Sequence, residues 1–123
     1  MLHEQITDPL YPNCPIRNVL SRICGKWPIL IMLALADKDR SMRFKEIEAE
    51  IPDISQRMLT ITLRDLEADG MVTRQVFAEV PPRVEYRLTE RARSFLPALG
   101  AVVDWAVDHI NDIITDRTNY QKK

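Results

Sequence analysis

The sequence predicts a mainly α-helical fold with one small β-hairpin, and three features of the 123-residue chain support this. Apolar residues recur every three to four positions in several stretches, which is the period of an amphipathic helix. Between residues 71 and 89 the period changes to two, which is typical of strands, and Val80-Pro81-Pro82 interrupts them. A chain of this length is sufficient for one domain with a modest core.

The first helix is expected to begin at Cys14-Pro15, because proline is favoured at the first helical position, and to end at Gly25. Residues 1–13 contain two prolines and no clear period, so we expect an N-terminal arm there. The helix is expected to bury the apolar residues Ile16, Val19, Leu20 and Ile23.

A second helix is predicted from about Trp27-Pro28 through the run ILIMLALA, and it should end in the polar residues Asp37 to Arg40. Because this run is apolar almost all round, the helix should be central to the core. The following residues, Ser41-Met42-Arg43, are expected to form a brief strand that pairs with the later hairpin.

Two short helices with a tight turn between them come next. The segment Arg43 to Ile51 places Phe44, Ile47 and Ile51 on one side of a helix, and Pro52-Asp53 ends it. Ser55 is suited to cap the following helix, because its hydroxyl can accept a hydrogen bond from an unpaired N–H in the first turn. The pair is typical of a helix-turn-helix.

The second of these helices, Ser55 to Gly70, has two distinct faces. Leu59, Leu63 and Leu66 recur on one side and should face the core. The other side carries the side-chain types that contact phosphates and base edges in a DNA major groove. The expected DNA-binding residues of this helix are Ser55, Gln56, Arg57, Thr60, Ile61 and Arg64. Because most amphipathic helices have a solvated polar face, this interpretation depends on the neighbouring elements.

The predicted hairpin supports the interpretation of Ser55 to Gly70 as a DNA-binding helix. Side chains alternate in direction along each of its two strands, which flank the Pro-Pro tip. A hairpin directly after a helix-turn-helix is the wing of a winged helix-turn-helix. Arg83 at the tip is expected to enter the adjacent minor groove or touch a phosphate. The alternative is that Arg83 is an ordinary solvated turn residue.

Thr89 is expected to cap a long closing helix, from Glu90 to about Arg117, which Pro97 should kink or divide. Apolar residues along it have the spacing of a contact between helices. The expected dimer-interface residues are Leu99, Val103, Ala106, Ile110 and Ile113. A symmetric dimer would supply two readers for paired DNA half-sites, whereas the alternative is a helix that folds back onto residues 29–36.

The formal net charge of −1, from 17 basic and 18 acidic side chains, argues against binding driven by bulk charge but permits a local basic face. It also leaves open a winged-helix module that binds protein instead of DNA. No nucleophile paired with a base, Gly-rich loop or metal-ligand cluster is visible, so we expect no enzyme activity, cofactor or metal. We expect a cytoplasmic protein without a membrane span, because no signal-peptide pattern or long apolar run is present.

Several motifs in one order closely resemble the HxlR-type winged helix-turn-helix regulators, over roughly residues 14–110. These motifs are Cys14-Pro15, Gly25-Lys26-Trp27, Arg43-Phe44, Ile54 to Thr60, Leu63 to Glu67, Asp69-Gly70, Val80 to Tyr86 and Leu88-Thr89. The resemblance implies a bacterial or archaeal transcription factor that binds promoter inverted repeats as a homodimer. Its parts would be an arm (1–13), a DNA-binding domain (14–89) and a C-terminal dimerisation helix and tail (90–123), with the N-terminal helix also in the dimer.

The resemblance also implies a candidate sensor, because in some members the cysteine that Cys14 matches responds to electrophiles or oxidants. A thiol at a helix N-terminus lies near unpaired N–H groups, which favour the thiolate. The alternatives are that Cys14 is only a structural cap and that a small ligand is the effector. If Cys24 lies on the same helix, ten residues separate the thiols too far for an intrachain disulfide.

Overall fold

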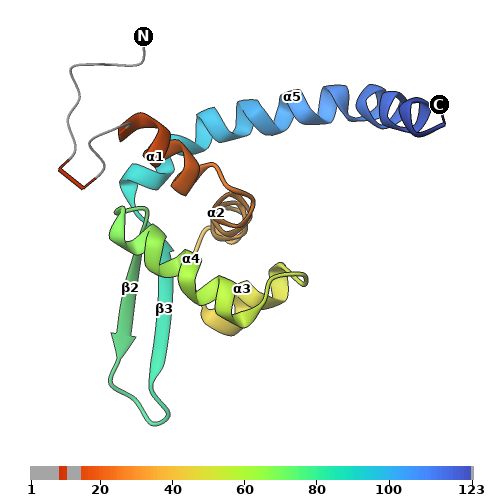
Figure 1. Ribbon diagram of the computed structural model, residues 1–123. Coiled ribbons are helices and arrows are strands. Elements are labelled where there is room, and N and C mark those ends of the chain that lie inside the picture. The colour runs from red at the N-terminus through yellow and green to blue at the C-terminus, as the bar shows by residue number, and fades with distance from the viewer. Residues whose placement is uncertain (1–8, 11–14, 123) are drawn as a thin grey trace. The chain divides into compact units, whose positions relative to one another are not determined.

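The computed structural model describes residues 9–10 and 15–122, and these residues form five helices and a three-stranded sheet (Figure 1). The predicted fold, which is mainly helical with a small hairpin, is confirmed. The chain divides into two compact units, one ending at Ala92 and the other beginning at Arg93.

The first two helices are α1 (Pro15–Ile23) and α2 (Lys26–Lys38). Helix α2 buries Ile31, Met32 and Leu35, as its apolar sequence predicted. The prediction that α1 buries four apolar side chains is wrong, because none of them is fully buried. Ile16 and Ile23 are half-buried, and Val19 and Leu20 are 47% and 50% exposed. The strong amphipathic pattern of α1 therefore provides an apolar face that the single chain leaves open to solvent.

Arg22 attaches α1 to the end of helix α4 (Gln56–Ala68). Its Nε donates to Asp69 Oδ2 at 2.6 Å, and its Nη2 lies 3.5 Å from Asp65 Oδ1.

No single helix among the described residues has the length and apolar composition to cross a membrane; only α1 and α2 taken together meet both criteria, across a 57° bend.

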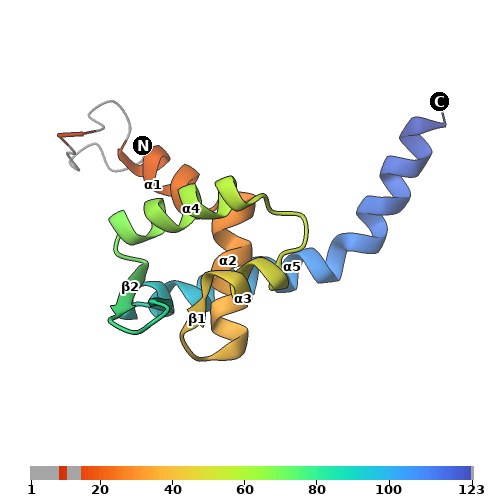
Figure 2. The ribbon, with the colours of Figure 1, turned by 90° about the horizontal axis from the view of Figure 1, so that it is seen from below.

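The helix-turn-helix consists of α3 (Phe44–Glu50) and α4. The predicted cap of α4 is confirmed, because the Ser55 hydroxyl accepts a hydrogen bond from the Met58 N–H at 3.0 Å. The three leucines of the predicted core face, Leu59, Leu63 and Leu66, are all buried. Figure 2 shows α3 and α4 beside α2, which runs behind them through the centre of the unit.

The sheet contains β1 (Met42–Arg43), β2 (Val72–Phe77) and β3 (Arg83–Leu88) in the antiparallel order β1-β3-β2. The short strand and its pairing with the hairpin are confirmed. Between α4 and β2, Gly70 adopts a φ of +72°, a left-handed conformation that favours glycine.

The strand register decides which side chains share a face of the sheet. Val72 lies opposite Leu88, and Arg74 lies opposite Tyr86, which in turn lies opposite Met42. Residues directly opposite each other point to the same side, as do alternate residues of a strand. Because Val72, Leu88 and Met42 are buried, Arg74 is on the core side of the sheet.

Helix α5 (Glu90–Gln121) begins in the first unit and forms the second. The predicted cap is confirmed, since the Thr89 hydroxyl accepts from the Ala92 N–H at 3.2 Å. The helix is continuous through Pro97, so the first turns are not a separate segment.

Candidate nucleic-acid interface

The polar face of α4 is open to solvent along its length. Gln56, Arg57, Ile61 and Arg64 are exposed and Thr60 is half-buried. Together these five residues line a shallow hollow of about 490 Å³. The helical period produces this face, because the buried leucines fix the rotation of α4 about its axis.

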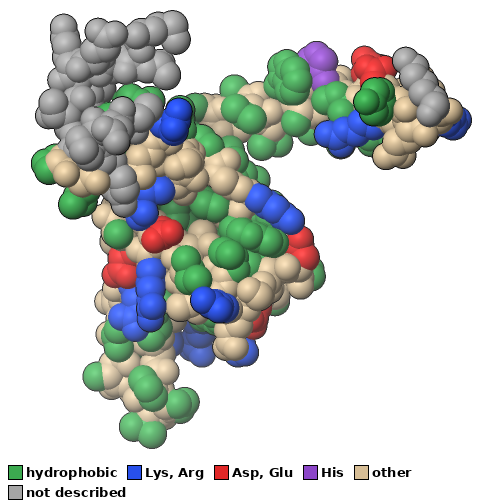
Figure 3. Space-filling model, viewed as in Figure 1, with side chains coloured by type: hydrophobic (Ala, Val, Ile, Leu, Met, Phe, Trp, Pro, Cys, Tyr) green, Lys and Arg blue, Asp and Glu red, His purple; other side chains and the backbone are tan. Residues whose placement is uncertain are grey.

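The basic residues of the first unit differ in whether they form ion pairs. Arg57, Arg64, Arg74 and Arg87 form no ion pair or hydrogen bond with the rest of the described chain. Six other basic residues of the first unit pair with carboxylates: Arg22, Lys26, Lys38, Arg40, Lys45 and Arg83. Figure 3 shows basic side chains spread over this face of the first unit. A net charge near zero is therefore compatible with unpaired cations on α4 and the hairpin.

Arg83, the expected wing contact, is folded back onto its own hairpin. Its guanidinium lies 3.3 Å from Glu79 Oε1, 3.0 Å from Glu85 Oε2 and 4.0 Å from the ring centroid of Phe77. The other carboxylate oxygen of Glu85 accepts a hydrogen bond from Ser41 at 2.8 Å. Two carboxylates share the charge of Arg83, whose side chain is 26% exposed, so the residue also links the loop of the wing to β3.

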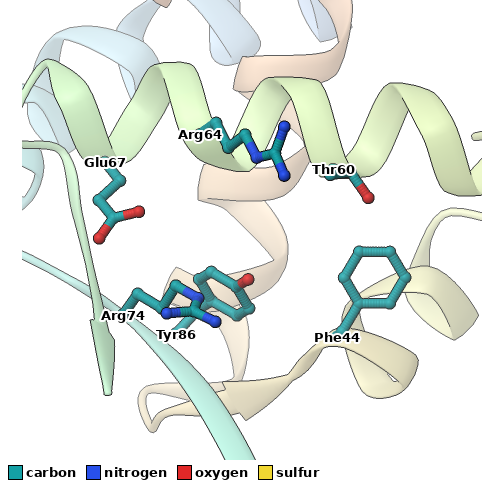
Figure 4. A pocket seen from close by; sticks show the side chains of 6 residues that line it. All are labelled: Phe44, Thr60, Arg64, Glu67, Arg74 and Tyr86. Atoms are coloured by element: carbon teal, nitrogen blue, oxygen red, sulfur yellow. The ribbon is translucent and has the colours of Figure 1, made fainter. Parts of the chain in front are cut away.

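A second hollow, of about 420 Å³, lies between α4 and the hairpin (Figure 4). Its lining residues come from α3, α4, β2 and β3: Phe44, Thr60, Arg64, Glu67, Arg74 and Tyr86. The sequence prediction included Thr60 and Arg64 but not Arg74 or Tyr86. A signal for Arg74 was available, because it lies two positions after the apolar Val72 and so on the same side of the strand.

The residues of α5 that were expected in the dimer interface differ in exposure. Ala106 and Ile110 are exposed, Val103 and Ile113 are half-buried, and Leu99 is 2% exposed. Because Leu99 is already buried in the single chain, it has little surface left for a partner. Further large apolar side chains of α5 are exposed: Val102, Trp105, Val107 and Ile114.

The cysteines differ in what the structure describes. Cys14 lies outside the described residues, whereas Cys24 is an exposed free thiol. Within residues 9–10 and 15–122, no three His, Cys, Asp or Glu side chains come together as a metal site would require.

A helix-turn-helix with an exposed polar second helix, followed by a hairpin wing, defines a winged helix-turn-helix protein. The chain belongs to the HxlR-like helix-turn-helix family, whose model matches residues 22–114. It is a transcriptional regulator of the helix-turn-helix type.

Relatives and solved structures agree with this assignment. An uncharacterized HTH-type transcriptional regulator of Methanothermobacter thermautotrophicus is 49% identical over 75% of this chain and 69% of its own length. The regulator YybR of Bacillus subtilis is 40% identical over 89% of both chains. The structure of the redox regulator HypR in its reduced form has a TM-score of 0.74 and 39% identity, over 82% of this chain and 98% of HypR.

Proposed function

We propose that this protein binds promoter DNA in a sequence-specific manner, as a homodimer on an inverted repeat, in the cytoplasm of a bacterium or archaeon. The observation that carries the proposal is the polar face of α4, which is exposed above a fully buried row of leucines. A helix of this kind fits the major groove, where side chains can read base edges directly. We expect no catalytic activity.

The side chains of α4 divide by the contacts that their chemistry allows. The guanidinium group of Arg57 can donate to two acceptors of guanine, and the amide of Gln56 can bind adenine. Ile61 can pack against the methyl group of thymine. These residues would determine sequence preference.

Other residues would contact the backbone. The hydroxyls of Ser55 and Thr60 are suited to phosphate oxygens, although each already forms a hydrogen bond within α4. Arg83 would contribute from the wing. Because Glu79 and Glu85 share its charge, its contribution to affinity should be smaller than that of Arg57 or Arg64.

DNA binding can be tested by selecting bound duplexes from a random pool and then measuring affinity by fluorescence anisotropy at several salt concentrations. We expect an inverted repeat, and a steep loss of affinity as salt rises, because each neutralised phosphate releases counterions. Arg57→Ala should weaken binding, while Lys45→Ala, which removes a cation paired with Glu48, should not. A protein that enriches no duplex and shifts none at low salt would contradict the proposal.

The exposed apolar side chains of α5 support the dimer. Val102, Trp105, Ile110 and Ile114 are each at least half exposed in the single chain, and several large exposed apolar side chains on one helix are typical of an interaction site. The open apolar face of α1 adds Val19 and Leu20. The interface residues predicted from the sequence, apart from the buried Leu99, are part of this proposal: Val103, Ala106, Ile110 and Ile113.

The proposed dimer can be tested with a matched pair of variants. Ile110→Glu places a charge in the proposed interface, so we expect monomers in sedimentation experiments and weaker binding to a two-site duplex. Asn111→Glu adds the same charge at the next, polar, exposed position and should leave the dimer intact. A wild-type protein that sediments as a monomer at micromolar concentration would refute the homodimer.

We also propose that an electrophile, an oxidant or a small ligand modulates DNA binding, with Cys14 as the thiol involved. The similarity to HypR, which is described as a redox regulator, supports a thiol response. Diamide should release DNA from the wild-type protein and from Cys24→Ser, but not from Cys14→Ser. Release from Cys14→Ser would exclude Cys14 as the sensor.

A further inference from the structure

We propose that the hollow between α4 and the hairpin holds a phosphate of the DNA backbone, bound by Arg74 of β2 together with Arg64 of α4. This inference depends on the DNA binding proposed above and adds a contact from the strand that the sequence did not indicate.

The sheet positions Arg74 for this contact. Arg74 pairs with Tyr86 across the two strands, and both line the hollow (Figure 4). They belong to the face of the sheet that also carries the buried Val72 and Met42. At the edge of the core this face is no longer covered, so the guanidinium of Arg74 emerges between β2 and α4.

The charge in the hollow calls for an anion. Neither Arg64 nor Arg74 forms an ion pair or hydrogen bond within the described residues, and both side chains line the same space. Two unpaired guanidinium groups repel each other, and an anion between them removes that repulsion. Guanidinium also matches phosphate geometrically, since it can donate two parallel hydrogen bonds, and the Tyr86 hydroxyl offers a further donor.

The shape of the surface favours DNA over a small anion. The hollow shares Thr60 and Arg64 with the shallow hollow along the polar face of α4, so the two lie next to each other on the surface. A duplex whose bases face α4 would therefore bring its backbone to Arg74. Glu67 is the acidic residue in the lining, and its carboxylate should oppose any phosphate that enters.

Arg87 provides a matched control for Arg74. It is also exposed and without an ion pair, it lies on the neighbouring strand, and it pairs with Thr73. Since Thr73 and Arg87 point to the opposite face from Arg74, their face turns away from the hollow. Arg87→Ala thus removes the same charge from the same hairpin without removing the proposed contact.

The test measures binding of the full chain to a labelled 30-base-pair duplex of mixed sequence, over a range of salt concentrations, because phosphate contacts do not depend on sequence. We expect Arg74→Ala to weaken binding several-fold and to lower the slope of log affinity against log salt by about one per protomer. Arg87→Ala should change affinity by less than about twofold, and Glu67→Gln should strengthen binding. Arg74→Gln, which keeps a polar side chain of similar length, replaces Arg74→Ala if that variant does not fold.

The outcomes separate this inference from the proposed function. If Arg57→Ala weakens binding while both Arg74 variants bind like the wild type, the hollow holds no phosphate although the protein binds DNA. If the wild type binds no duplex at any salt concentration, both proposals fail. Inorganic phosphate, added at constant ionic strength, should not change the melting temperature. If it raises that of the wild type but not of Arg74→Gln, the hollow is a small-anion site and the assignment to DNA is overturned.

Discussion

Leu63 and Ile61 lie two positions apart on α4 and should respond to truncation in opposite ways. Leu63 is 1% exposed and Ile61 is 40% exposed. Truncating a fully buried leucine to alanine costs about 2–5 kcal/mol, from lost burial and from the cavity that remains. Against a total stability of about 5–15 kcal/mol this is a large fraction, and it should lower the melting temperature by on the order of 15 °C.

Ile61→Ala should cost less than about 1 kcal/mol of stability, because a largely exposed side chain leaves little cavity. It should instead reduce affinity for the selected operator, since the contact with a thymine methyl group is lost. Leu63→Ala, measured at a temperature where it is folded, should bind the same operator with nearly wild-type affinity.

Urea unfolding followed by circular dichroism gives the two stabilities, and fluorescence anisotropy gives the two affinities. If both substitutions lower the free energy of unfolding equally, the division of α4 into a core face and an open face is wrong. If Ile61→Ala leaves operator binding unchanged, the stability result can stand but Ile61 has no part in the interface.

Three further results are expected, each measurable by urea unfolding. Ser55→Ala removes the cap of α4 and should cost about 1 kcal/mol, whereas Ser55→Asp should retain it. Gly70→Ala should cost more than about 1 kcal/mol, because alanine is strained at a φ of +72°. The hydrogen bond from Arg40 lowers the pKa of Glu46 from its ordinary value of 4.5, so this carboxylate stabilises the fold above that pH. The advantage of the wild type over Glu46→Gln should disappear as the pH falls through the lowered pKa, and an advantage that persists in acid would contradict this.

Short-range patterns predicted most of the fold. The leucine spacing of α4, the serine before it and the threonine before α5 depend on neighbours within one or two turns, and each prediction was confirmed. The brief strand at Met42 and its pairing with the hairpin were also predicted and are confirmed, although three residues carry little periodicity. Pro97 was expected to kink the closing helix or to divide it, and the division did not occur, because α5 continues through Pro97.

Identifying the candidate interface required both the sequence pattern and the tertiary structure. The periodicity of α4 was sufficient to identify an open polar face, because a helix turns its side chains by a fixed angle at each residue. The same reasoning overestimated α1, whose Val19 and Leu20 are apolar but uncovered. A period shows which side chains share a face, but it does not show whether another element covers that face.

The sequence by itself therefore determined the helices, the hairpin, the caps and the family. Only the tertiary structure decided which arginines are unpaired. Arg83, expected to be free at the wing tip, lies between Glu79 and Glu85, while Arg74 turns toward α4 beside Tyr86. The physical reason is that ion pairs and hollows depend on strand register and on helix packing, which bring together residues that are far apart in the chain.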